Sequence, residues 1–163
     1  MYALIATLLA LASAPPKDAF PGKPFSAVRA FVMNEDVTGP PPCLVAVDAK
    51  GTLCKSVRGP GRVLTPSQAA TLQSTLNAPT SFGEPESKCF IPHHAFVYYD
   101  AHGQVVGQAA VCFMCDAVRG EPDVPAQGKD PSKTSLSKDG KAALQSLCRD
   151  LGLAHCAGEP PRP

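Results

Sequence analysis

Seven cysteines in a chain of 163 residues restrict the possible folds, because each must form a disulfide, ligate a metal or be buried as a free thiol. An apolar run from Ala3 to Leu11 precedes Ala12-Ser13-Ala14, a pattern typical of a signal peptidase site. Residues 1–14 are therefore predicted to be a signal peptide. The mature protein is expected to be exported, to the periplasm or outside the cell, where disulfides persist. No positive charge precedes the run, which leaves open a different start codon or a buried N-terminal helix.

Charge and length narrow the partners and the number of domains. The formal net charge is +1 and the lysines and arginines do not cluster, so neither nucleic acid nor an anionic membrane is expected as a partner. The apolar run is shorter than the roughly 20 residues that span a bilayer, so no stable membrane insertion is expected after cleavage. We expect a Pro-rich mobile leader over 15–26, a single domain over 27–157 and a disordered tail over 158–163. The identity of any protein partner stays open.

Local signals predict two helices and one isolated strand. Thr65 precedes Pro66 and a helical pattern, which predicts a helix from 66 to 77 with a capping box at its start. Ser137 caps a second helix, predicted from 138 to 150. The β-prone segment 25–33 precedes a Pro-rich stretch that must stop it, so it is predicted to be an edge strand.

Turn signals predict two β-hairpins. One joins 43–48 to 52–57, and the other joins 95–100 to 104–112. Residues 119–135 are rich in Pro, Gly and Lys and are predicted to form a long loop. The expected architecture is α+β, with an antiparallel sheet built mainly from the two hairpins and covered by two amphipathic helices.

The register of the second hairpin leads to a metal site. A two-residue turn at His102-Gly103 would make the numbers of paired residues sum to about 205, so that Cys112 faces His93. Five ligand-type side chains then gather at the open end of the hairpin: Cys89, His93, His94, Cys112 and Cys115. Cys3His is a familiar zinc ligand set, and thiolates also suit Cu⁺. We therefore expect a zinc or copper ion, with a structural or metal-buffering role. His93 is preferred over His94 as the fourth ligand, because strand alternation puts it on the face of Cys112.

Two other interpretations of the same cysteines stay open. Cys89 can form a disulfide with Cys112 or Cys115, which would leave a disulfide-stabilised binding module without metal. The Cys112-x2-Cys115 pair can instead belong to a thiol oxidoreductase. Metal analysis combined with peptide mapping of the disulfides separates the metal site from the binding module, and thiol titration at varied pH tests the oxidoreductase.

The remaining four cysteines suggest local disulfides. Cys148 and Cys156 bracket the end of the second helix, and Cys43 and Cys54 lie in the first hairpin. Two such disulfides would leave an odd number of cysteines, which suits a Cys3His site. His155 is expected to be a solvated residue near the terminus. The chain has no nucleophile elbow, phosphate-binding glycine loop or HExxH helix, so binding is expected rather than catalysis.

Overall fold

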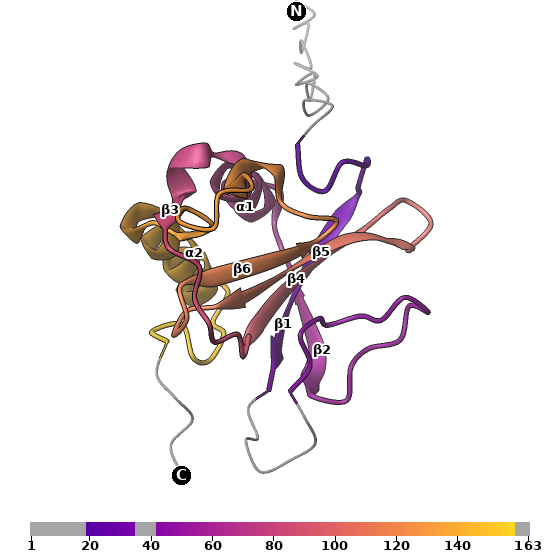
Figure 1. Ribbon diagram of the computed structural model, residues 1–163. Coiled ribbons are helices and arrows are strands. Elements are labelled where there is room, and N and C mark those ends of the chain that lie inside the picture. Colours follow the sequence, from indigo (N-terminus) through magenta and orange to yellow (C-terminus); the bar gives the residue numbers. More distant parts are fainter. Residues whose placement is uncertain (1–18, 35–41, 159–163) are drawn as a thin grey trace, which may run out of the picture.

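The computed structural model describes residues 19–34 and 42–158, so the predicted signal peptide and residues 159–163 lie outside the described part. The protein has an α+β fold whose centre is a five-stranded sheet in the order β2-β1-β4-β5-β6 (Figure 1). Each neighbouring pair of strands is antiparallel. The strands are β1 (Ala27–Met33), β2 (Val57–Val63), β4 (His94–Tyr99), β5 (Val105–Cys112) and β6 (Ala117–Glu121).

Two helices cover one face of this sheet, and both have the bounds that the sequence predicts. They are α1 (Pro66–Asn77) and α2 (Lys138–Asp150). The Thr65 hydroxyl accepts a hydrogen bond from the Gln68 amide, and the Gln68 side chain accepts one from the Thr65 amide, which confirms the capping box. Leu72 and Leu76 of α1 pack into one core with Leu144 and Leu147 of α2 and the facing sheet residues.

Short elements complete this layer. A small second sheet joins β3 (Phe82–Glu84) to β7 (Ser135–Leu136). Two short 3-10 helices precede its strands: η1 (Pro79–Ser81) leads into β3, and η2 (Pro125–Gln127) lies before β7. No helix in the part of the chain that the structure describes is long and apolar enough to cross a membrane.

The prediction that 25–33 is an edge strand is wrong, because β1 lies between β2 and β4. Its alternate residues are buried on both faces: Val28 and Ala30 on the helix side, Phe31 and Met33 on the other. Burial on both faces is typical of a central strand. The edge strand on this side of the sheet is β2. Its sequence, VRGPGRV, contains two glycines and a proline, which are uncommon in strands, so β-propensity does not predict it. Such a proline is tolerated at a sheet edge, where one side of the strand needs no hydrogen-bonded partner.

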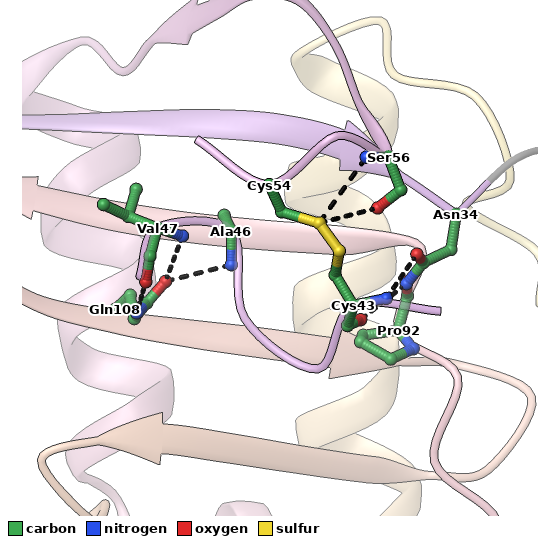
Figure 2. The surroundings of a disulfide bond; sticks show 8 residues. All are labelled: Asn34, Cys43, Ala46, Val47, Cys54, Ser56, Pro92 and Gln108. Carbon is green, nitrogen blue, oxygen red and sulfur yellow. Dashed lines mark hydrogen bonds between the residues drawn. A yellow bond between two sulfur atoms is a disulfide. The ribbon is translucent and has the colours of Figure 1, made fainter. Parts of the chain in front are cut away.

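The second face of the sheet is covered by the loop around residues 43–56 rather than by a hairpin of the sheet. The turn predicted at 49–51 is present, with one bridge between Val47 and Leu53, but the two arms of this described loop do not extend into strands of the sheet. Gln108 of β5 attaches this loop to the sheet. The buried Gln108 side chain accepts hydrogen bonds from the Ala46 and Val47 amides and donates one to the Val47 carbonyl (Figure 2). One polar side chain thus fastens the loop to the sheet.

Asn34 fastens the other end of the same loop. Its side-chain amide donates to the carbonyls of Cys43 and Pro92 at 2.7 and 2.8 Å, and its oxygen accepts from the Cys43 amide (Figure 2). The residue has φ of 55°, a left-handed conformation that Asn adopts more readily than most residues. Asn34 therefore positions both the 43–56 loop and the segment that leads into β4.

Two segments predicted to be irregular are ordered parts of the fold. The described end of the predicted leader packs against the core: Phe20 is buried, and its ring contacts Tyr98 edge-to-face at 5.3 Å. The Phe20 amide also donates to the Asn77 side chain at 2.7 Å. The predicted 119–135 loop contains the second half of β6, which the preference of Gly and Pro for loops conceals.

Candidate metal centre

The predicted register of the β4–β5 hairpin is confirmed. His94 pairs with Val111, Ala95 with Ala110 and Phe96 with Ala109, so each pair sums to 205. The turn has three residues, 101–103, instead of the two that were predicted. It is closed by a hydrogen bond from the Asp100 amide to the Gln104 carbonyl. Next to this turn Tyr99 pairs with Val105, which gives a sum of 204. An irregularity between Tyr98 and Tyr99 shifts the pairing by one residue, so that Tyr98 pairs with Gly107 and the sum becomes the predicted 205.

This register directs His94 toward the helices. The histidine shares its sheet face with Phe96 and Tyr98, and its ring lies 5.1 Å from that of Phe113. It is 1% exposed. Ala95 and Val97 belong to the cluster on the opposite face. Among the described residues, His94 is thus the histidine that enters the space between the sheet and α2.

The end of α2 brings two cysteines to the same place. Cys148 lies in the last turn of the helix, and Gly152, with φ of 63°, turns the chain back just past its C-cap residue Leu151. Cys156 returns to Cys148 with a Cα–Cα separation of 5.6 Å, at disulfide distance. The packing of α2 on the sheet places this cysteine pair directly beside His94.

The three side chains form a compact buried group. His94 Nε2 lies 3.4 Å from Cys148 Sγ. The ligand atoms of His94, Cys148 and Cys156 all lie within 4.8 Å of one another. All three residues are buried. Sulfur and imidazole are the ligands that zinc and copper prefer, so this group has the chemistry of a metal site once its sulfur atoms are thiolates.

The His94 ring is held neutral. Burial lowers its pKa from 6.5 to about 4, the backbone contact with Ala154 opposes that shift, and the nearby His93 and His155 add to it. Because a carbonyl only accepts, Nε2–H donates to the Ala154 carbonyl at 2.6 Å. Nδ1 is then a buried acceptor with no hydrogen-bond partner among the described residues.

That tautomer sets a condition for metal binding. To ligate through Nε2, His94 must move its proton to Nδ1, and the Ala154 carbonyl must give up its hydrogen bond. The Ala154 carbonyl belongs to the short loop that carries Cys156. Metal capture and a shift of this loop are therefore coupled.

Two other histidines, His93 and His155, lie near the group of His94, Cys148 and Cys156. The rings of His93 and His155 lie 5.3 Å apart, and both residues act electrostatically on His94. His155 has φ of 60°, a left-handed conformation. It was expected to be a solvated terminal residue, yet it lies against a buried histidine. Three of the four histidines of the chain thus meet at the end of α2.

The sequence-predicted ligands fall into two groups. Cys89 and Cys115 lie at disulfide distance, with Cα atoms 5.9 Å apart. Cys112 is buried beside them in a cluster that includes Cys115, on the sheet face opposite His94. As the structure stands, no set of three Cys with His93 or His94 converges on one point among the described residues, because the Cys89 and Cys115 sulfur atoms are directed at each other.

The two local cysteine pairs suggested by the sequence both lie at disulfide distance. Cys43 and Cys54 have Cα atoms 6.5 Å apart and close the base of the 43–56 loop (Figure 2). With Cys148–Cys156 and Cys89–Cys115, six of the seven cysteines, all within the described ranges, are paired. Cys112 is the remaining free thiol.

The contact between His94 and Cys148 is what sequence reasoning missed. The sequence holds two signals for it: strand alternation puts His94 on the face opposite His93, and the helical spacing from Leu144 and Leu147 puts Cys148 on the apolar face of the second helix. Neither signal states which point of the helix lies over which strand. Comparison of the chain with protein-family models, curated proteins and solved structures finds no match.

Proposed function

We propose that this protein is an exported, disulfide-stabilised metal-binding protein that holds one Zn²⁺ or Cu⁺ ion between His94, Cys148 and Cys156 when that cysteine pair is reduced. The observation that carries the proposal is the convergence of their three ligand atoms within 4.8 Å in a buried position. The ring nitrogen nearest to a cysteine sulfur supports it, because Nε2 of His94 lies 3.4 Å from Cys148 Sγ.

The charge of the ligand set suits a thiophilic cation. Two thiolates and a neutral imidazole give the empty ligand set a net charge of –2, and no carboxylate belongs to the group. The low pKa of His94 keeps its imidazole unprotonated at neutral pH, so the metal does not compete with a proton there. Three soft ligands without a fourth suit Cu⁺, while Zn²⁺ needs a fourth donor such as water or a nearby histidine.

The cysteine pairs support the export and disulfide parts of the proposal. Three cysteine pairs at disulfide distance are typical of oxidising compartments. In such a compartment the Cys148–Cys156 pair rests as a disulfide, which has no thiolate to offer. Metal binding then requires a dithiol reductant, which transfers two electrons and two protons to the disulfide and leaves as a disulfide itself.

The test is anaerobic metal titration of the fully reduced protein, with a chromophoric chelator as competitor for Cu⁺ or Zn²⁺. We expect one ion per chain, and loss of binding by at least tenfold in His94→Ala and in Cys148→Ser/Cys156→Ser. The matched control is Cys43→Ser/Cys54→Ser, which removes another cysteine pair far along the chain and should retain the ion. Circular dichroism of each variant establishes that it folds.

A fourth variant separates the two candidate ligand sets. Cys89→Ser/Cys115→Ser removes two thiols of the Cys3His set predicted from the sequence. If this variant loses the ion while Cys148→Ser/Cys156→Ser keeps it, the metal binds at the sequence-predicted set and the proposal for His94 is overturned. Absence of binding in the folded, reduced wild type would overturn both.

A second candidate function is a disulfide-stabilised binding module without metal, and the three cysteine pairs favour it. A surface hollow along β6, lined by Leu44, Glu121 and Lys129 among others, offers such a module a contact area of mixed character. This function predicts that the reduced protein binds no metal and that a chelator leaves its melting temperature unchanged.

A further inference from the structure

Three cysteines outside the proposed metal centre form a second sulfur-containing group. Cys89 lies in the segment leading to β4, and Cys112 and Cys115 lie at the end of β5 and in the turn that follows it. The proposed metal centre uses none of them. The group combines a disulfide and a free thiol within one short stretch of structure.

The two sulfur atoms of the disulfide differ in their surroundings. Cys89 is an exposed residue. Cys115 is 5% exposed and lines a surface hollow of about 520 Å³ with Met114, Lys138 and Lys141. Met114 stands at the side of this hollow with 46% of its surface exposed. The disulfide therefore faces solvent through Cys89 and a hollow through Cys115.

The free thiol lies on the inner side of the same group. Cys112 is fully buried and packs in one cluster with Phe90 and Cys115. Only Phe113 and Met114 separate it from Cys115 along the chain. Cys112 ends β5, and Cys115 lies in the turn that follows. A Cys-x2-Cys pair across a turn has the spacing at which two sulfurs can bond, as they do in disulfide oxidoreductases.

The hollow is lined by charged side chains of both signs, Lys138 and Lys141 with Glu84 and Asp116. Lys138 and the N-terminal turn of α2 line it, and Lys141 bonds the Asp116 carboxylate at 2.5 Å, next to Cys115 along the chain. Lysine side chains and a helix N-terminus favour thiolates over thiols nearby. Because Lys141 is paired with Asp116, Lys138 and the start of α2 are the groups here that favour a thiolate, and Glu84 opposes them.

We propose that Cys89, Cys112 and Cys115 form a thiol relay, in which the single free thiol moves from the buried Cys112 to the exposed Cys89. Cys112 attacks Cys115 Sγ as a thiolate, and the proton that it gives up is balanced by the one that Cys89 takes up when it leaves. The Cys112–Cys115 bond forms as the Cys89–Cys115 bond breaks, and Cys89 leaves as a thiolate that takes up a proton or reacts. No electrons are gained or lost in this exchange, so it needs neither an oxidant nor a reductant.

The relay gives the protein an activity at Cys89 toward disulfide-containing molecules. The Cys89 thiolate attacks one sulfur of such a molecule, forms a mixed disulfide and releases the other half as a thiolate. Reaction of a second thiol with the mixed disulfide returns Cys89. The chemistry is disulfide exchange, and it works while Cys148–Cys156 remains oxidised, so it does not depend on the metal proposal.

The experiment labels the oxidised, native protein with a maleimide in the presence of a chelator and identifies the labelled cysteine by mass spectrometry. Trypsin leaves all three cysteines in one peptide, from Cys89 to Arg119, so chymotrypsin is added to cleave after Phe113 and separate Cys112 from Cys115. We expect the label on Cys89 and a disulfide between the Cys112 and Cys115 fragments. Rapid labelling in urea at low pH, followed by the same digestion, reports the resting arrangement.

The matched variant is Cys112→Ala, which is close in size and keeps Cys89–Cys115 linked. It should reduce labelling of Cys89 at least tenfold, and reaction with an aromatic disulfide by the same factor. Label on Cys112 in the native wild type would mean that the buried thiol reacts directly and would overturn the relay. Absence of label from the native protein, with one thiol per chain appearing in urea, would overturn it as well.

Discussion

Burial of His94 makes the stability of the fold depend on pH in a way that can be measured without metal. The pKa of this histidine is about 4 in the folded protein against 6.5 in an unfolded chain, chiefly because of burial. As the pH falls, the unfolded chain therefore takes up the proton first. The folded state keeps its full stability above pH 6.5 and loses it progressively as the pH falls toward 4.

The size of the effect follows from the two pKa values. A difference between 6.5 and about 4 corresponds to a total of about 3 kcal/mol, of which about 2 kcal/mol is lost between about pH 7 and about pH 4.5. Since His94 is 1% exposed, solvent screening reduces this figure little. Small domains are stable by roughly 5–15 kcal/mol, so the loss is readily detected.

Urea unfolding of the oxidised protein with chelator, at a series of pH values, measures this loss. The variant for comparison is His94→Gln, whose amide can still donate to Ala154 but cannot titrate. Its stability should fall by about 2 kcal/mol less than that of the wild type over the same range. His102→Gln, altered in an exposed turn, serves as the control and should follow the wild type. Equal pH dependence in wild type and His94→Gln would refute the reasoning, as would a His94 NMR signal that titrates near pH 6.5.

Three further substitutions test the packing. Gln108→Leu should cost about 2–3 kcal/mol in urea unfolding, because two amides of the 43–56 loop lose their buried acceptor. Gly140→Ala should lower the melting temperature, because the added methyl group would collide with the Ser81 carbonyl and force α2 away at a cost of about 1–3 kcal/mol. Thr65→Ala should cost about 1 kcal/mol through loss of the cap of α1, and an unchanged melting temperature would contradict the role given to the capping box.

Local signals predicted local structure well. The bounds of α1 and α2 follow from Thr65 and Ser137, whose side chains satisfy amides that the helix itself cannot. The register of β4 with β5 also follows from a short turn, although the turn and the irregularity at Tyr98 compensate for each other. These features depend on neighbours a few residues away, and such interactions can be read along the chain.

Features set by distant contacts were not predictable in the same way. β2 contains two glycines and a proline and becomes a strand only because β1 presents an open edge to it. The meeting of His94 with Cys148 depends on where α2 crosses the sheet. Gly140 sets that position through its close approach to Ser81. A predicted set of metal ligands is therefore sensitive to helix placement even when the strand register is right.

The position of β1 between β2 and β4 affects how the chain folds. Ala27 pairs with Tyr99 and Val32 with His94, so β1 pairs with a strand that is far away along the chain. The middle of the sheet therefore forms only when β4 has come into contact with β1. Such nonlocal pairing slows folding. Until it is complete, the apolar segment AVRAFVM has an unpaired edge that another copy of the chain can occupy. In the folded protein, β2 and β4 protect both edges of β1. We therefore expect slow-folding variants of this protein to aggregate through β1.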